Sequence, residues 1–150
     1  MDKRLIYRLK EFYTLETFQV AYYQAQVDAS TDEYYTKVFE KLVKIEQGHV
    51  DYFANKIELA NETVPVLVGS MFDLAGSILG ETAEAMGQMN TCKYGAALEK
   101  KAMQEYQTFI QECKENNYFT LNNDLMEYLL DEHFHALWLA DYSEKLKENQ

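Results

Sequence analysis

The chain has 150 residues, of which 47% are hydrophobic and 26% charged, values that are ordinary for a globular protein. This length suffices to bury a core without disulfides, so we expect residues 1–150 to form a single domain. The net charge of -11 argues against a nucleic-acid-binding protein, because such a protein needs a basic surface. It also argues against attachment to anionic lipid, so we do not expect membrane contact.

The chain shows no apolar leader after its first residues, and its most apolar segment is a poor membrane span. That segment, residues 64–80, is interrupted by polar side chains that include Asp73. Cys92 and Cys113 stand alone, with no Cys-x-x-Cys pair, as is usual for reduced thiols. We therefore expect a cytoplasmic protein.

Four long helices are expected, because apolar residues recur at three- and four-residue steps and the chain contains a single proline. They should cover residues 5–28, about 31–60, 91–114 and 120–147. Ser30 and Glu33 have the spacing of a capping box, which places the start of the second helix near residues 31–33. A short extra helix is expected in the crossover at residues 64–80. The sequence thus predicts an all-α four-helix bundle.

The four helices form a repeat of two hairpins. The pair Leu-Glu, then six intervening residues, then the pair Tyr-Gln occurs in the first helix from Leu15 and in the third helix from Leu98. The helix after each of them contains Glu-x-x-His. An internal repeat of this kind indicates a bundle of two similar helical hairpins joined by the crossover.

The two Glu-x-x-His motifs indicate a metal site. Residues three apart on a helix share a face, with Cβ atoms about 5–6 Å apart, so Glu46 and His49 can hold one ion. Glu132 and His135 form the second pair, and the apolar residues around that pair, among them Leu130, indicate that it points into a core.

Each hairpin supplies a further carboxylate at the level of its Glu-x-x-His pair. Glu16 lies about 14 residues before the first turn and Glu46 about 16 after it, so both are roughly 21–24 Å from the turn. Glu99 and Glu132 lie about 17 and 16 residues from the second turn. A single Glu on an apolar helix face is more often a solvated residue, but equal levels in both hairpins favour ligands.

The expected ligand set takes one Glu from each of two helices and Glu-x-x-His from each of the other two. Its members are Glu16, Glu46, His49, Glu99, Glu132 and His135. Four carboxylates balance two divalent cations, and the imidazoles leave positions open for a small ligand. The set predicts two iron ions, with manganese as the alternative. We expect Glu46 and Glu132 to bridge the ions and the other four residues to be terminal ligands.

Three residues near the ligands have secondary roles. Tyr23 and Tyr106 lie two turns after Glu16 and Glu99 and should face the same interior. Core packing is the expected role of these tyrosines, with a hydrogen bond to a ligand or a redox role as the alternative. His133 points about 100° away from the inward face, so we expect it at the surface or beside a ligand.

With these ligands in place, the chain resembles the ferritin-like di-iron superfamily, and most closely its demethoxyubiquinone hydroxylase branch, over about residues 8–142. The order of Glu and Glu-x-x-His matches at all six ligands, and Tyr23 and Gln26 after the first ligand are also similar. The resemblance implies a ferritin-like bundle and a di-iron oxidoreductase that activates or reduces dioxygen or peroxide. A monooxygenase is one enzyme of this class.

Two other functions stay open: a non-catalytic protein for iron binding, handling or sensing, and a rubrerythrin-like peroxidase. The additional Glu of the peroxidases would fall near Ala96, and a rubredoxin-type Cys-x-x-Cys is missing. An enzyme would need dioxygen or peroxide and an electron donor protein or reductase, because no flavin or nicotinamide motif occurs. A homodimer is also compatible with the sequence. Residues 64–80 should cover the bundle or, alternatively, dock a partner.

Overall fold

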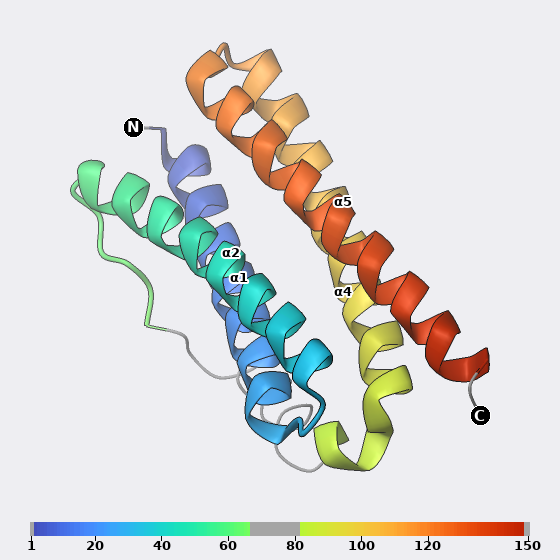
Figure 1. Ribbon diagram of the computed structural model, residues 1–150. Coiled ribbons are helices and arrows are strands. Elements are labelled where there is room, and N and C mark those ends of the chain that lie inside the picture. Colours follow the sequence, from blue (N-terminus) through green and yellow to red (C-terminus); the bar gives the residue numbers. More distant parts are fainter. Residues whose placement is uncertain (1, 67–81, 149–150) are drawn as a thin grey trace. The chain divides into compact units, whose positions relative to one another are not determined.

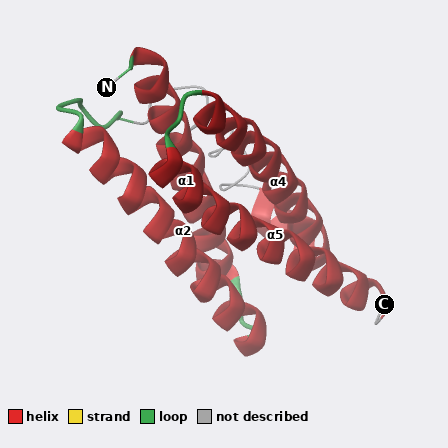
Figure 2. Cartoon of the chain, turned by 90° about the horizontal axis from the view of Figure 1, so that it is seen from above, coloured by secondary structure: helices red, strands yellow, loops and turns green. Residues whose placement is uncertain are grey.

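The structure, a computed structural model, describes residues 2–66 and 82–148, and these residues form helices only (Figures 1 and 2). The helices are α1 (Lys3–Ala29), α2 (Glu33–Leu59), α4 (Thr82–Glu115) and α5 (Phe119–Glu148). The predicted all-α class is therefore confirmed. The short helix expected in the crossover falls mainly on residues 67–81, outside the described residues, and residues 64–66 are not helical.

The chain divides into two compact units, Met1–Ala85 and Met86–Gln150. The first contains α1 and α2, and the second contains α5 and nearly all of α4. Each unit is thus one helical hairpin, as the repeat predicted. The expectation of a single domain over residues 1–150 stays a prediction.

Helices α1 and α2 run antiparallel and pack along each other (Figure 1). Aromatic pairs join them at two levels: the ring centroids of Phe12 and Phe53 are 5.4 Å apart, and those of Tyr23 and Phe39 are 5.5 Å apart. All four side chains are almost fully buried. Such pairs add about 0.5–1.5 kcal/mol each beyond the burial of their area, so they fix the hairpin above and below its middle.

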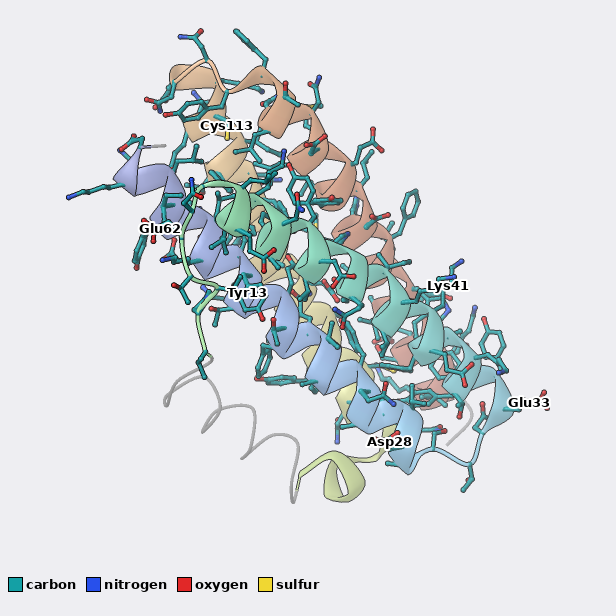
Figure 3. The ribbon with its side chains drawn as sticks, turned by 90° about the vertical axis from the view of Figure 1, so that its left-hand side faces the viewer. Tyr13, Asp28, Glu33, Lys41, Glu62 and Cys113 are labelled. Carbon is teal, nitrogen blue, oxygen red and sulfur yellow. The ribbon has the colours of Figure 1, made fainter. Side chains whose placement is uncertain are left out.

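The turn between α1 and α2 is capped by Asp32, not by Ser30. The Asp32 carboxylate accepts a hydrogen bond of 2.6 Å from the Tyr35 backbone N–H, which satisfies a donor of the first turn of α2. The predicted helix start was correct, but the predicted cap was wrong, because the Ser30 hydroxyl accepts instead from the Asp32 N–H at 3.2 Å. Asp28 and Glu33 mark the two sides of this turn in Figure 3.

Replacing Asp32 by alanine is expected to lower the free energy of unfolding by about 1 kcal/mol, because the first turn of α2 loses its cap. Urea unfolding followed by circular dichroism measures the change. Asp28→Ala is the control, since the Asp28 carboxylate accepts only an exposed bond from Gln24. Equal effects of the two substitutions would show that the Asp32 cap contributes nothing.

Asparagine ends a helix in each hairpin. Asn61 follows α2 with φ 57°, and Asn117 follows α4 with φ 61°. In the second case the Tyr118 N–H donates to the Cys113 carbonyl at 2.9 Å, the bond expected where a left-handed residue closes a helix. The chain turns at residues 116–117, between the third and fourth predicted helices, so that α5 runs antiparallel to α4 (Figure 1).

Helix α4 begins earlier than predicted and is kinked. It starts at Thr82 rather than near residue 91, and Gly87 within it has φ 68° and ψ 159°, which are not helical. Only glycine adopts this φ without steric cost, so the kink lies where the sequence permits it. After the kink, α4 continues to Glu115 and carries the expected ligand Glu99.

The segment after α2 returns beside α1. Lys10 Nζ and Glu62 Oε2 are 2.8 Å apart, and Figure 3 shows Glu62 near the start of the segment. The hydrogen bond and the charge of Lys10 lower the pKa of Glu62. Because the pair is exposed, it orients the segment more than it stabilises the fold.

Candidate metal centre

The first hairpin brings three of the predicted ligands together. Glu16 on α1 and Glu46 on α2 are fully buried, and His49 on α2 is 2% exposed. His49 Nδ1 lies 3.1 Å from Glu46 Oε2 and 3.4 Å from Glu16 Oε2. One ligand atom from each of the three residues therefore falls within 4.8 Å of the others. We call Glu16, Glu46 and His49 the first triad.

The second hairpin brings together the other three. Glu99 on α4 and Glu132 on α5 are fully buried, and His135 on α5 is 3% exposed. His135 Nδ1 lies 3.7 Å from Glu99 Oε1 and 3.8 Å from Glu132 Oε2, so this second triad is slightly wider than the first. Its ligand atoms also fall within 4.8 Å of one another.

Helical spacing explains why these carboxylates are buried. Glu16 lies one turn after Phe12, and Glu46 lies one turn after Leu42, on faces whose other buried residues are mostly apolar. A carboxylate in such a place loses its hydration, which costs several kcal/mol unless a cation or hydrogen bonds replace the water. The burial of two carboxylates around one imidazole in each hairpin therefore needs a compensating charge.

The donor atoms in each triad match a particular class of cation. Each hairpin offers carboxylate oxygens and one imidazole nitrogen, a set that suits divalent iron or manganese. Cys92 and Cys113, both fully buried, belong to neither triad, so no thiolate selects a softer metal there. The residues of each triad thus fit a hard or intermediate divalent cation.

The two tyrosines near the ligands are packed among aromatic rings. Tyr23 is fully buried against Tyr22 and Phe39, with ring centroids 5.4 and 5.5 Å away. Tyr106 is fully buried, with its ring centroid 6.4 Å from that of Tyr128. These contacts support the packing role expected for both. A hydrogen bond to a ligand or a redox role stays a prediction.

Two further residues define the surroundings of the ligands. His133, beside Glu132, is exposed, as its helical position indicated. Gln19 is fully buried one turn after Glu16, and sequence reasoning missed it as a candidate. Its position three residues after a ligand on the same helix face could have indicated it. The repeat places Ala102 at the corresponding site of the second hairpin, so the two halves differ there.

A family model matches most of this chain. The sequence fits the family model of the ubiquinone biosynthesis protein COQ7 over residues 16–146, a range that contains both triads. No match was found among curated proteins. Within residues 2–66 and 82–148, no helix has the length and apolar character needed to cross a membrane.

The family match covers most of the chain and agrees with the chemistry of the triads. Proteins of this family are di-iron hydroxylases of the ferritin-like superfamily, so the predicted resemblance and the predicted oxidoreductase of monooxygenase type are confirmed. The buried carboxylate and histidine residues support metal binding. The chain therefore belongs to the COQ7 family of di-iron hydroxylases.

Proposed function

We propose that the two triads meet in one di-iron centre. Glu16 and His49 would be terminal ligands of one ion, Glu99 and His135 would be terminal ligands of the other, and Glu46 and Glu132 would bridge. The geometry within each hairpin supports this scheme, because each hairpin supplies two carboxylates and one imidazole. The distances from the imidazole Nδ1 to the carboxylate oxygens are 3.1–3.8 Å. Two such halves give the ligand set of ferritin-like di-metal carboxylate bundles.

Iron is the metal that we propose, in preference to manganese. Carboxylate and imidazole ligands accept either ion, so the donor set alone does not select. The di-iron character of the family favours iron. Four carboxylates would leave two ferrous ions without excess charge, which suits a site from which water is excluded.

The chain's own residues would hold the ions in a dry environment. Bound iron would supply open coordination positions and electrons for the reduction of dioxygen. The carboxylates of each triad fix the positions of the ions, and each histidine leaves room for a small ligand. Phe12 lies one turn before Glu16 and Phe53 lies one turn after His49, and both side chains are at most 1% exposed, so they would keep water away from that side of the site.

We propose that the reaction is hydroxylation of the ring of a ubiquinone precursor. The observation that supports it most is the family match over residues 16–146 together with two complete ligand triads. One atom of dioxygen would enter the product and the other would leave as water, which consumes two electrons from a reductase or other electron donor. The homodimer and the cytoplasmic location expected from the sequence stay predictions.

A single-turnover experiment tests this function. Protein loaded with ferrous iron under anaerobic conditions is mixed with ¹⁸O₂ and a demethoxyquinone that has a short isoprenoid chain. We expect one ¹⁸O atom per hydroxylated ring, and product in proportion to di-iron sites. Exposed Glu58 on α2 provides the matched control, because Glu58→Ala should leave the yield unchanged.

Other outcomes would assign another function. Rapid consumption of hydrogen peroxide without hydroxylated product would indicate the peroxidase. Iron that stays bound, is oxidised once without giving product, and is not reduced again by any electron donor would indicate an iron-binding or sensing protein. Either result would contradict the hydroxylase.

A further inference from the structure

Helix α5 exposes a row of large apolar side chains to solvent. Among the described residues, the five members of this row are 48–67% exposed. They are Phe119, Met126, Leu130, Phe134 and Leu137, and we call them the outer stripe. Isolated exposed apolar residues are common, but a row of five along one helix is the kind of apolar patch that marks an interaction surface.

The outer stripe lies opposite the ligand face of the same helix. Successive helical residues are about 100° apart, so Leu130 points about 200° away from Glu132. Glu132 and His135 are buried, and nothing that covers their face can also cover the opposite one. A helix that is apolar on both faces is normally covered on both, whereas the exposed fractions of the outer stripe show that none of the residues the structure describes covers the outer side of α5.

The spacing of the outer stripe fits another helix. From Phe119 onward, its members follow one another at steps of seven, four, four and three residues. Such steps are typical of the apolar seam of a coiled coil. From Phe119 to Leu137 the stripe is about 27 Å long at about 1.5 Å per residue. A partner helix of about 18–20 residues would match it.

The border of the outer stripe is acidic. From Phe119 to Glu144, α5 contains no Lys or Arg, and Asp124, Glu127 and Asp131 lie along one side of the stripe. The first lysine or arginine of α5, Lys145, is paired with Asp141 at 2.6 Å. A second copy of α5 would place acidic borders against each other, and anionic lipid would be repelled in the same way.

We propose that the outer stripe docks another protein through an amphipathic helix whose apolar seam is bordered by Lys or Arg. The apolar seam would pack between Met126, Leu130 and Leu137, and the basic residues would face Glu127 and its acidic neighbours. Electrostatic complementarity of this kind selects the partner and speeds its association more than it adds affinity. The site is independent of the proposed reaction, since it lies on the opposite face of α5 from the ligands.

Two synthetic helical peptides test this proposal on the full chain. They share the same length and apolar seam, and one has Lys at the bordering positions where the other has Glu. Trp138, the only tryptophan of the chain, follows Leu137, is partly buried and stacks on Tyr142 at 4.9 Å, so its fluorescence reports binding. We expect the Lys peptide to bind at least ten-fold more tightly than the Glu peptide, and less tightly as salt is raised.

Substitutions locate the binding. The double variant Leu130→Ser with Leu137→Ser should weaken binding of the Lys peptide at least ten-fold, because Leu130 lies within the outer stripe and Leu137 ends it. Leu59→Ser on α2 is the matched control, because Leu59 is 71% exposed and lies in the other hairpin. Both sets of residues are exposed, so neither change should unfold the protein.

Four results would overturn the proposal. The first is failure of the Lys peptide to bind, and the second is equal binding of the Glu peptide. The third is self-association of the chain, or binding to phosphatidylcholine vesicles, that the double variant abolishes. The fourth is slow alkylation of Leu130→Cys compared with Leu59→Cys, which would show that the chain itself covers the stripe. Buried Cys92 and Cys113 give little background in that measurement.

Discussion

Replacing Glu46 by alanine is expected to remove both metal ions from the protein, although the residue belongs to only one hairpin. Glu46 is fully buried beside His49, and in the proposed centre its carboxylate contacts both ions. Loss of a bridging ligand should cost more than the ten- to hundred-fold typical of residues that only orient a ligand. We expect the iron content to fall below about 0.1 ion per chain and the activity to fall by at least about 100-fold.

The matched variants separate bridging from terminal ligands. Glu132→Ala, in the other hairpin, should give the same result as Glu46→Ala, whereas Glu16→Ala should weaken one position and leave the other partly filled. Glu58→Ala should retain both ions, because Glu58 is exposed on the same helix as Glu46. Metal content is measured by mass spectrometry after gel filtration. One full equivalent of iron in Glu46→Ala would contradict the bridging role.

Removing the metal is expected to lower the melting temperature by at least about 10 °C. An ion that binds only the folded state, at a free concentration of a thousand times its Kd, adds about 4 kcal/mol to the free energy of unfolding. Two such sites add twice as much. For a chain of this length, a change of 1 kcal/mol in the free energy of unfolding shifts the melting temperature by about 2–4 °C. Without metal, moreover, the carboxylates of both triads are buried without the cation that compensates them.

Thermal unfolding of the chelated and iron-loaded protein, under anaerobic conditions, measures this difference. Glu46→Ala provides the control, since its melting temperature should not respond to iron. Glu46→Gln keeps the side-chain volume without the charge, so a folded but metal-insensitive Glu46→Gln would show that the shift comes from ligation. Equal melting temperatures of the chelated and loaded wild-type protein would mean that the triads bind no metal strongly.

The helices were largely predictable, because the apolar period determines them. The first helix was expected at residues 5–28 and is observed at Lys3–Ala29. The start of α4 was not predictable, because Gly87 and the glycine-rich stretch before it hide the helical period. The cap at Asp32 was missed because Ser30 offered the more familiar spacing, although Asp32 lies closer to the helix.

The ligand pairs were predictable because spacing alone determines them. In Glu46 and His49, or Glu132 and His135, a step of three residues places both side chains on one face. The burial of Gln19 was missed, because a glutamine is usually solvated, although its position three residues after Glu16 places it on the ligand face of α1.

The outer stripe was also missed. Leu130 was taken as an indication that the neighbouring ligand pair points into a core, and the pair is buried, but Leu130 itself is 50% exposed. The apolar period assigns one apolar face to a helix, whereas α5 has two. The ligand pair Glu132 and His135 marks the face that the hairpin buries, and the period does not reveal the second face.

The proposal that the two triads form one di-iron centre is tested by anomalous X-ray diffraction at the iron edge, on a crystal of the iron-loaded protein. We expect two iron peaks about 3.5–4 Å apart, one beside His49 and the other beside His135, with Glu46 and Glu132 touching both. A single peak, or two peaks separated by much more than that distance, would contradict it.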